Sequence, residues 1–141
     1  MKKVFILVLT MAFFSCATTT KKQESRPLFE VLTQQEDGGA SIHFFEILSE
    51  PQEIIMLQND PKLKNKISPN DIQTSNFILM NMGEKSTGGY KIVIESVVET
   101  DKNIIVTIKE ITPEPSKIVT QEIATPYCVV RINSKKEIII K

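Results

Sequence analysis

Hydrophobic and polar residues alternate in short runs along most of the chain, the period-two pattern typical of strands with one buried face. The run Asn76–Met82 is almost continuously apolar, which predicts a central strand buried on both faces. Gly-, Pro- and Asn-containing segments separate the runs, as turns do. The pattern predicts about eight short strands in a mainly antiparallel sheet, curled or two-layered. They cover residues 28–33, 41–49, 76–82, 90–99, 103–111, 118–123, 127–132 and 137–140.

One segment has a different period. Residues 51–59 read "PQEIIMLQN", with apolar positions at a rough helical spacing and Pro51 where the first turn of a helix tolerates it. Ser49 or Glu50 lies near the expected cap, and Pro61 ends the element. The prediction is one short helix that covers an open face of the sheet, followed by a polar loop. The fold class is therefore α+β.

The N-terminus has the pattern of a signal peptide. Lys2 and Lys3 precede an apolar run, Val4–Phe14, that is too short for a stable transmembrane helix. The run ends in Phe13-Phe14-Ser15-Cys16, which resembles the lipobox of bacterial lipoproteins, with Phe13 where leucine is usual. We expect cleavage after residue 15 and lipidation of Cys16. An ordinary secretory signal cleaved elsewhere, or an uncleaved anchor, are the alternatives.

The lipoprotein interpretation sets the rest of the domain plan. Residues 16–27 would be the lipidated cysteine and a polar tether, and residues 28–141 a single domain. We expect a bacterial cell-envelope protein anchored to a membrane, and Ala17 after the cysteine favours the periplasmic side of the outer membrane. Cys128 is then left without a partner for a disulfide, and its apolar neighbours predict a buried core residue.

Gly88 and Gly89 interrupt two strand-like runs and raise the question of a phosphate-binding loop. Gly83 and Gly88 have the spacing of such a loop, but Gly89 and Tyr90 stand where lysine and a hydroxyl residue are required. The β-branched run that follows also provides no helix N-terminus for an anion. The glycine pair is better interpreted as a hairpin turn that needs positive φ. No nucleotide and no other cofactor is expected.

Catalytic and metal chemistry find little support. The only histidine, His43, lies in an alternating strand, and we interpret it as a solvent-facing or rim residue. One histidine and one unlipidated cysteine are too few for a zinc site, and no calcium-loop spacing occurs. The formal net charge of zero gives no electrostatic footprint for nucleic acid. We therefore expect no metal and no enzymatic activity.

In the second half of the chain, an apolar strand ends in Gly83 and is followed by Thr87-Gly88-Gly89-Tyr90. The turn Pro113–Pro115 and then Thr125-Pro126-Tyr127 come before the last apolar strand. In these features, residues 76–132 resemble the C-terminal domain of the PrcB family of protease-complex subunits. The resemblance implies a non-enzymatic lipoprotein that accompanies an extracytoplasmic protease, as an accessory or stabilising subunit.

Two turns are therefore candidate binding elements on a sheet scaffold. The candidate binding residues are Thr87, Gly88, Gly89, Tyr90, Thr125, Pro126 and Tyr127, and the two tyrosines are of the kind enriched in protein contacts. The alternative is that the glycines and Pro126 only shape turns and the tyrosines pack over strand ends. A second functional alternative is a chagasin-like protease inhibitor, because Thr87–Tyr90 is similar to the Thr-Thr-Gly-Tyr wedge of that family.

Overall fold

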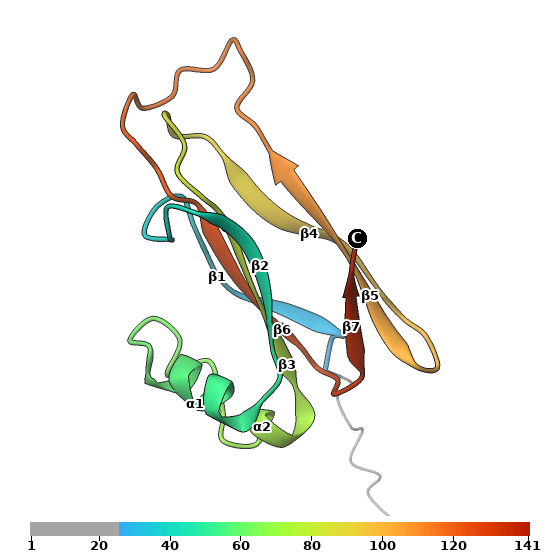
Figure 1. Ribbon diagram of the computed structural model, residues 1–141. Coiled ribbons are helices and arrows are strands. Elements are labelled where there is room, and N and C mark those ends of the chain that lie inside the picture. The colour runs from blue at the N-terminus through green and yellow to red at the C-terminus, as the bar shows by residue number, and fades with distance from the viewer. Residues whose placement is uncertain (1–25) are drawn as a thin grey trace, which may run out of the picture.

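The computed structural model describes residues 26–141, which form two β-sheets and two short helices (Figure 1). The predicted signal peptide, Cys16 and most of the tether lie outside the described residues. In chain order the elements are β1 (Phe29–Gln35), β2 (His43–Leu48), α1 (Pro51–Asn59), α2 (Asp71–Thr74), β3 (Asn76–Met82), β4 (Lys91–Glu99), β5 (Asn103–Ile111), β6 (Tyr127–Ile132) and β7 (Glu137–Ile140). Neither helix in residues 26–141 is long and apolar enough to cross a membrane.

The strands are divided between a four-stranded sheet, in the order β1-β6-β3-β2, and a three-stranded sheet, in the order β4-β5-β7. The predicted α+β fold with a two-layered, mainly antiparallel arrangement is confirmed. One pair departs from it, because β7 runs parallel to β5. As predicted, β3 is central, and six of its seven residues are buried.

Two apolar clusters explain why the four-stranded sheet is buried on both faces. Ile78, Met80 and Met82 of β3 point towards the three-stranded sheet and pack with its Ile104 and Val106. The opposite face of the four-stranded sheet belongs to a second cluster, where Leu32, Leu48, Phe77 and Val129 meet the helical segment through Ile54, Leu63 and Ile67. The alternation of side chains along each strand separates the two clusters.

The predicted helix over residues 51–59 is confirmed with the same bounds. Its start is stabilised by Glu53, whose carboxylate accepts hydrogen bonds from the backbone N–H groups of Ser49 and Glu50, both at 2.9 Å. The structure adds α2, which the sequence did not predict. Asp71 organises this turn, because its carboxylate accepts the Ser68 N–H at 2.7 Å and pairs with Arg131 at 3.0 Å.

Two predictions about the second half are wrong. Residues 118–123 form no strand; the segment makes only an isolated bridge at Ala124, since its backbone meets the β3–β4 connection at intervals and not as a ladder. Gly88 and Gly89 also do not close a hairpin. β3 and β4 belong to different sheets, so the glycines lie in a crossover between the two layers, and of the pair only Gly89 has positive φ (88°).

Candidate functional site

Three segments far apart in the sequence meet at one end of the molecule, towards the top of Figure 1. We call residues 37–42, 83–90 and 112–126 together the loop end. Lys85 and Ala124 exchange two backbone hydrogen bonds, at 2.8 and 2.9 Å, and Gly88 donates to the Thr120 carbonyl at 3.0 Å. On the other side, Glu84 donates to the Ser41 carbonyl at 3.0 Å. The two predicted binding turns are therefore parts of one structure.

The glycines allow the segments to approach closely. A Cβ atom on Gly89 would lie 2.9 Å from both Pro113 Cβ and Val119 Cγ1, and its φ of 88° is strained for any other residue. A Cβ atom on Gly88 would lie 2.4 Å from Thr120 Oγ1, and Gly88 is buried. Both glycines therefore fit the structural alternative, in which they shape the backbone and do not contact a partner.

Thr125 anchors the first segment to the third. The Asp37 carboxylate accepts hydrogen bonds from the Thr125 hydroxyl at 2.8 Å and the Thr125 N–H at 3.1 Å, and Gly39 donates to the Thr125 carbonyl at 2.9 Å. The Thr125 hydroxyl, followed by the backbone N–H groups of Gly38 and Thr125, lowers the pKa of Asp37. Pro126 is buried, and its carbonyl accepts the Met82 N–H at 3.0 Å.

The two candidate tyrosines face different layers. Tyr90 is partly buried and packs against the cluster between the sheets, with Lys85 Nζ 5.5 Å from the centre of its ring. Tyr127 packs on the helix side, and its hydroxyl accepts a hydrogen bond from Lys62 Nζ at 3.1 Å. That bond and the Tyr127 phenol charge raise the pKa of Lys62. Thr87 is half-buried on the crossover.

Exposed aliphatic side chains are the feature of the loop end that sequence reasoning missed. Ile118 is fully exposed, and Ile42 and Ile123 are 66% and 65% exposed. Ile42 is next to Ser41, whose carbonyl accepts the Glu84 N–H of the crossover. Ile123 is next to Ala124, which bonds to Lys85 of the crossover. The exposure of Ile118 and Ile123 was not predicted because residues 118–123 were interpreted as a strand, in which isoleucines are expected to be half-buried.

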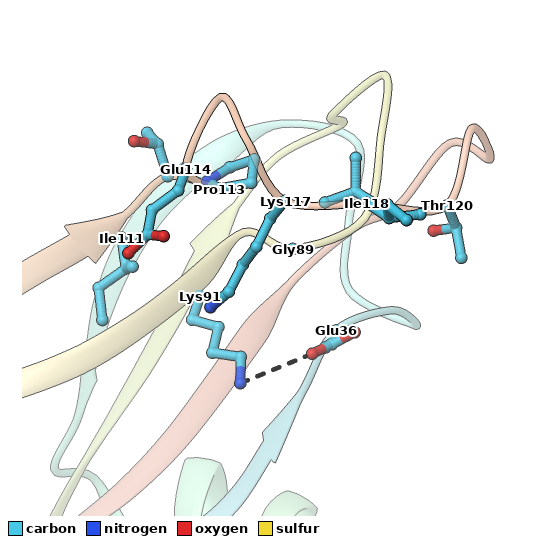
Figure 2. A pocket seen from close by; sticks show the side chains of 11 residues that line it. Glu36, Gly89, Lys91, Ile111, Pro113, Glu114, Lys117, Ile118 and Thr120 are labelled. Carbon is cyan, nitrogen blue, oxygen red and sulfur yellow. Dashed lines mark ion pairs between the residues drawn. The ribbon is translucent and has the colours of Figure 1, made fainter.

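A pocket of about 470 Å³ lies beneath the third segment of the loop end (Figure 2). Gly89 and Lys91 form one side, and Ile111, Pro113 and Lys117 are among the residues around it. Lys91 Nζ lies 3.7 Å from a carboxylate oxygen of Glu36, drawn as a dashed line in Figure 2. The lining contains both charge signs and aliphatic carbon but no histidine or cysteine.

The residues with the greatest catalytic potential lie elsewhere. His43 is an exposed rim residue, as predicted, and its Nε2 lies 2.5 Å from Glu110 Oε1. Cys128 is a buried core residue, as predicted, and burial raises the pKa of its thiol to about 12. Among residues 26–141, no three His, Cys, Asp or Glu side chains are grouped to hold a metal ion.

These features define a class of protein: a small α+β domain of two packed sheets whose connections gather at one end. Comparison with protein families then gives a family. Residues 76–133 match the family model described as PrcB C-terminal, which confirms the resemblance of this part of the chain to the PrcB family. The match begins at β3 and ends just after β6, and it includes two of the three segments of the loop end. Comparisons with curated proteins and with solved structures gave no match.

At the level of the family, the match fits an accessory subunit of a protease complex.

Proposed function

We propose that this protein is a lipid-anchored, non-enzymatic accessory module of the bacterial cell envelope that binds another envelope protein through the loop end. An extracytoplasmic protease is the partner that the family favours. The observation that carries the proposal is the set of exposed isoleucines at the loop end, Ile42 on the first segment and Ile118 and Ile123 on the third, which backbone hydrogen bonds tie to the segment between them. Exposed apolar surface of this kind is a feature of protein-binding sites.

The hydrogen bonds that hold the three segments of the loop end together would also favour binding. Because Lys85, Gly88 and Thr125 are already hydrogen-bonded within the loop end, little chain entropy would be lost when a partner docks. The charged residues around the isoleucines include Lys85 and Glu122, which would form a polar rim. The candidate residues Thr87, Tyr90 and Tyr127 contribute partly exposed surface, while Gly88, Gly89 and Pro126 support the backbone.

Photo-crosslinking in native envelopes tests this proposal. A photoreactive residue replaces Ile123 in the full-length chain, and a matched control replaces Lys102, which is exposed in the β4–β5 turn at the opposite end of the three-stranded sheet. We expect a reproducible protein adduct from position 123 and none from position 102. The same adducts from both positions, or none from either, would contradict the proposal.

The chagasin-like alternative requires Thr87–Tyr90 to protrude as a wedge. In the structure Gly88 is buried and its N–H is bonded to Thr120, which gives this alternative less support. Titration of the protein against papain separates the two functions. We expect no inhibition; sub-micromolar inhibition that a bulky change at the exposed neighbour, Ser86→Trp, abolishes would favour the inhibitor instead.

A further inference from the structure

The strand β2 is an exposed edge with few of the features by which proteins protect edges. It pairs with β3 on one side only, over six residues in regular register, and contains no proline, lysine or bulge. The other edges differ. β1 has a bulge between Val31 and Thr33, β4 has one between Ile94 and Ser96, and β7 is only four residues long. β2 is therefore the edge most open to a further strand.

The ladder shows which backbone groups of β2 face outward. Met82 donates its N–H to the Pro126 carbonyl, so the even-numbered residues of β3 face β6. The odd-numbered residues of β3 therefore face β2, where they bond to Phe44, Glu46 and Leu48. The N–H and C=O groups of His43, Phe45 and Ile47 point away from the sheet. Among residues 26–141, no other hydrogen bond reaches these groups.

The side chains beside these groups are apolar and accessible. Phe45 and Ile47 are each 36% exposed, and they lie opposite the buried Met80 and Ile78 at the margin of the cluster between the sheets. The accessible edge of β2 has a defined length. The His43–Glu110 contact marks one end, and Lys135 Nζ, which donates to the Ser49 carbonyl at 2.8 Å, marks the other.

Glu46 indicates the charge of the occupant. It is exposed on the helix-side face of β2, between Phe44 and Leu48, and forms no ion pair with any described residue. A basic residue directly opposite Glu46 would stabilise a pairing, whereas an acidic one would oppose it. In an antiparallel pair of two copies of this chain, Glu46 would face Glu46, Phe44 or Leu48 of the second copy. None of these is basic, so charge favours a different polypeptide.

We propose that β2 binds an extended segment of a partner protein as a fifth strand of the four-stranded sheet. The segment has apolar residues opposite Phe45 and Ile47 and a lysine or arginine opposite Glu46. The outward groups of His43, Phe45 and Ile47 supply the backbone hydrogen bonds. This inference rests on the proposed function in that the partner is a protein, but it uses a different surface from the loop end.

A designed peptide tests the pairing directly. The protein is the chain from residue 16 with Cys16→Ser, which keeps every described residue, and the probe is a seven-residue peptide of alternating valine and threonine with one central threonine replaced by lysine. We expect amide hydrogen exchange at Phe45 and Ile47 to slow on binding, whereas Phe44 and Glu46 are protected already. Two versions of the peptide, N-methylated on alternate amides, control for strand pairing: one should lose binding and the other keep it.

A charge exchange tests the choice of occupant. Glu46→Lys should weaken binding of the lysine peptide about two- to fivefold and strengthen binding of a glutamate peptide by a similar factor. Equal binding of both methylated peptides, protection at another strand, or concentration-dependent dimerisation through β2 without peptide would each overturn the proposal. Peptide binding at β2 without any adduct from position 123 would contradict only the proposed role of the loop end, and the reverse result only the strand addition.

Discussion

Lys85 and Ala124 exchange both of their backbone hydrogen bonds, at 2.8 and 2.9 Å, although they lie 39 positions apart in the chain. This bridge joins the crossover between the two sheets to the long connection between β5 and β6. The bridge brings the crossover, where Gly89 lies close to Pro113, beside the segment that displays Ile123.

The first prediction concerns the crossover glycines. Gly89→Ala should destabilise the protein by about 2 kcal/mol or more, because φ of 88° is strained for alanine and the new Cβ would meet Pro113 and Val119 at 2.9 Å. Gly88→Ala is the matched control and should cost about 1 kcal/mol, since its φ is not positive and the Thr120 hydroxyl can rotate away. Urea unfolding measures both changes in stability. Equal losses of stability would contradict a special requirement for glycine at position 89.

The second prediction is a pH dependence from Asp37. Its pKa is lowered by the Thr125 hydroxyl and by backbone N–H groups, so the folded state favours the ionised carboxylate. This contribution to stability is present above the ordinary aspartate pKa of about 4 and is lost as the pH falls through the lowered value. Asp37→Asn should lower the melting temperature at pH 7 but not at pH 2. A constant difference across this range would show that the ionised form is not involved.

The third prediction concerns the ion pair that holds α2 to β6. Asp71 is fully buried and Arg131 is 11% exposed, so Asp71→Asn would leave a largely buried guanidinium with only the half-exposed carboxylate of Glu30. We expect a loss of about 3–5 kcal/mol in unfolding free energy. Glu30→Gln removes the other, half-exposed carboxylate that contacts Arg131 and should cost less than about 1 kcal/mol. Denaturant titration of both variants should show this order; the reverse order would exclude Asp71 as the main partner.

The fourth prediction concerns Cys128. With its thiol buried and its pKa raised to about 12, it should not react with a thiol reagent at pH 8 in the folded protein. The measurement uses the Cys16→Ser variant, so that only one thiol remains. We expect full labelling in urea and almost none in buffer. Rapid labelling without denaturant would mean that the cluster between the sheets opens readily.

The fifth prediction tests the anchor. If Cys16 carries lipid, Cys16→Ser should release the protein from the membrane fraction and remove incorporation of a labelled fatty acid, since the acyl chains provide the attachment. Cys128→Ala is the control and should keep both properties. Membrane retention of Cys16→Ser would favour the uncleaved anchor. Secretion of the chain with Cys16 in place but without lipid would favour the ordinary signal peptide.

The local pattern was sufficient wherever a residue's neighbours in sequence also decide its environment. The alternation in β4 and β5, the apolar run of β3 and the proline at the start of α1 each predicted their element, because strand and helix periodicities place side chains on faces without reference to the rest of the chain. The same local reasoning identified His43 as a rim residue and Cys128 as a core residue.

Long-range pairing had to come from the tertiary structure. The sequence marked Gly88-Gly89 as a place where the backbone needs freedom, but only the three-dimensional arrangement shows that β3 and β4 lie in different sheets and that Pro113 and Val119 occupy the space a side chain would need. The sequence predicts that Asp71 lies in a polar loop, whereas in the structure it pairs with Arg131, 60 positions away. The period of the hydrophobic pattern indicates which face of its element a residue lies on. Which residue it contacts on that face depends on how the whole chain packs.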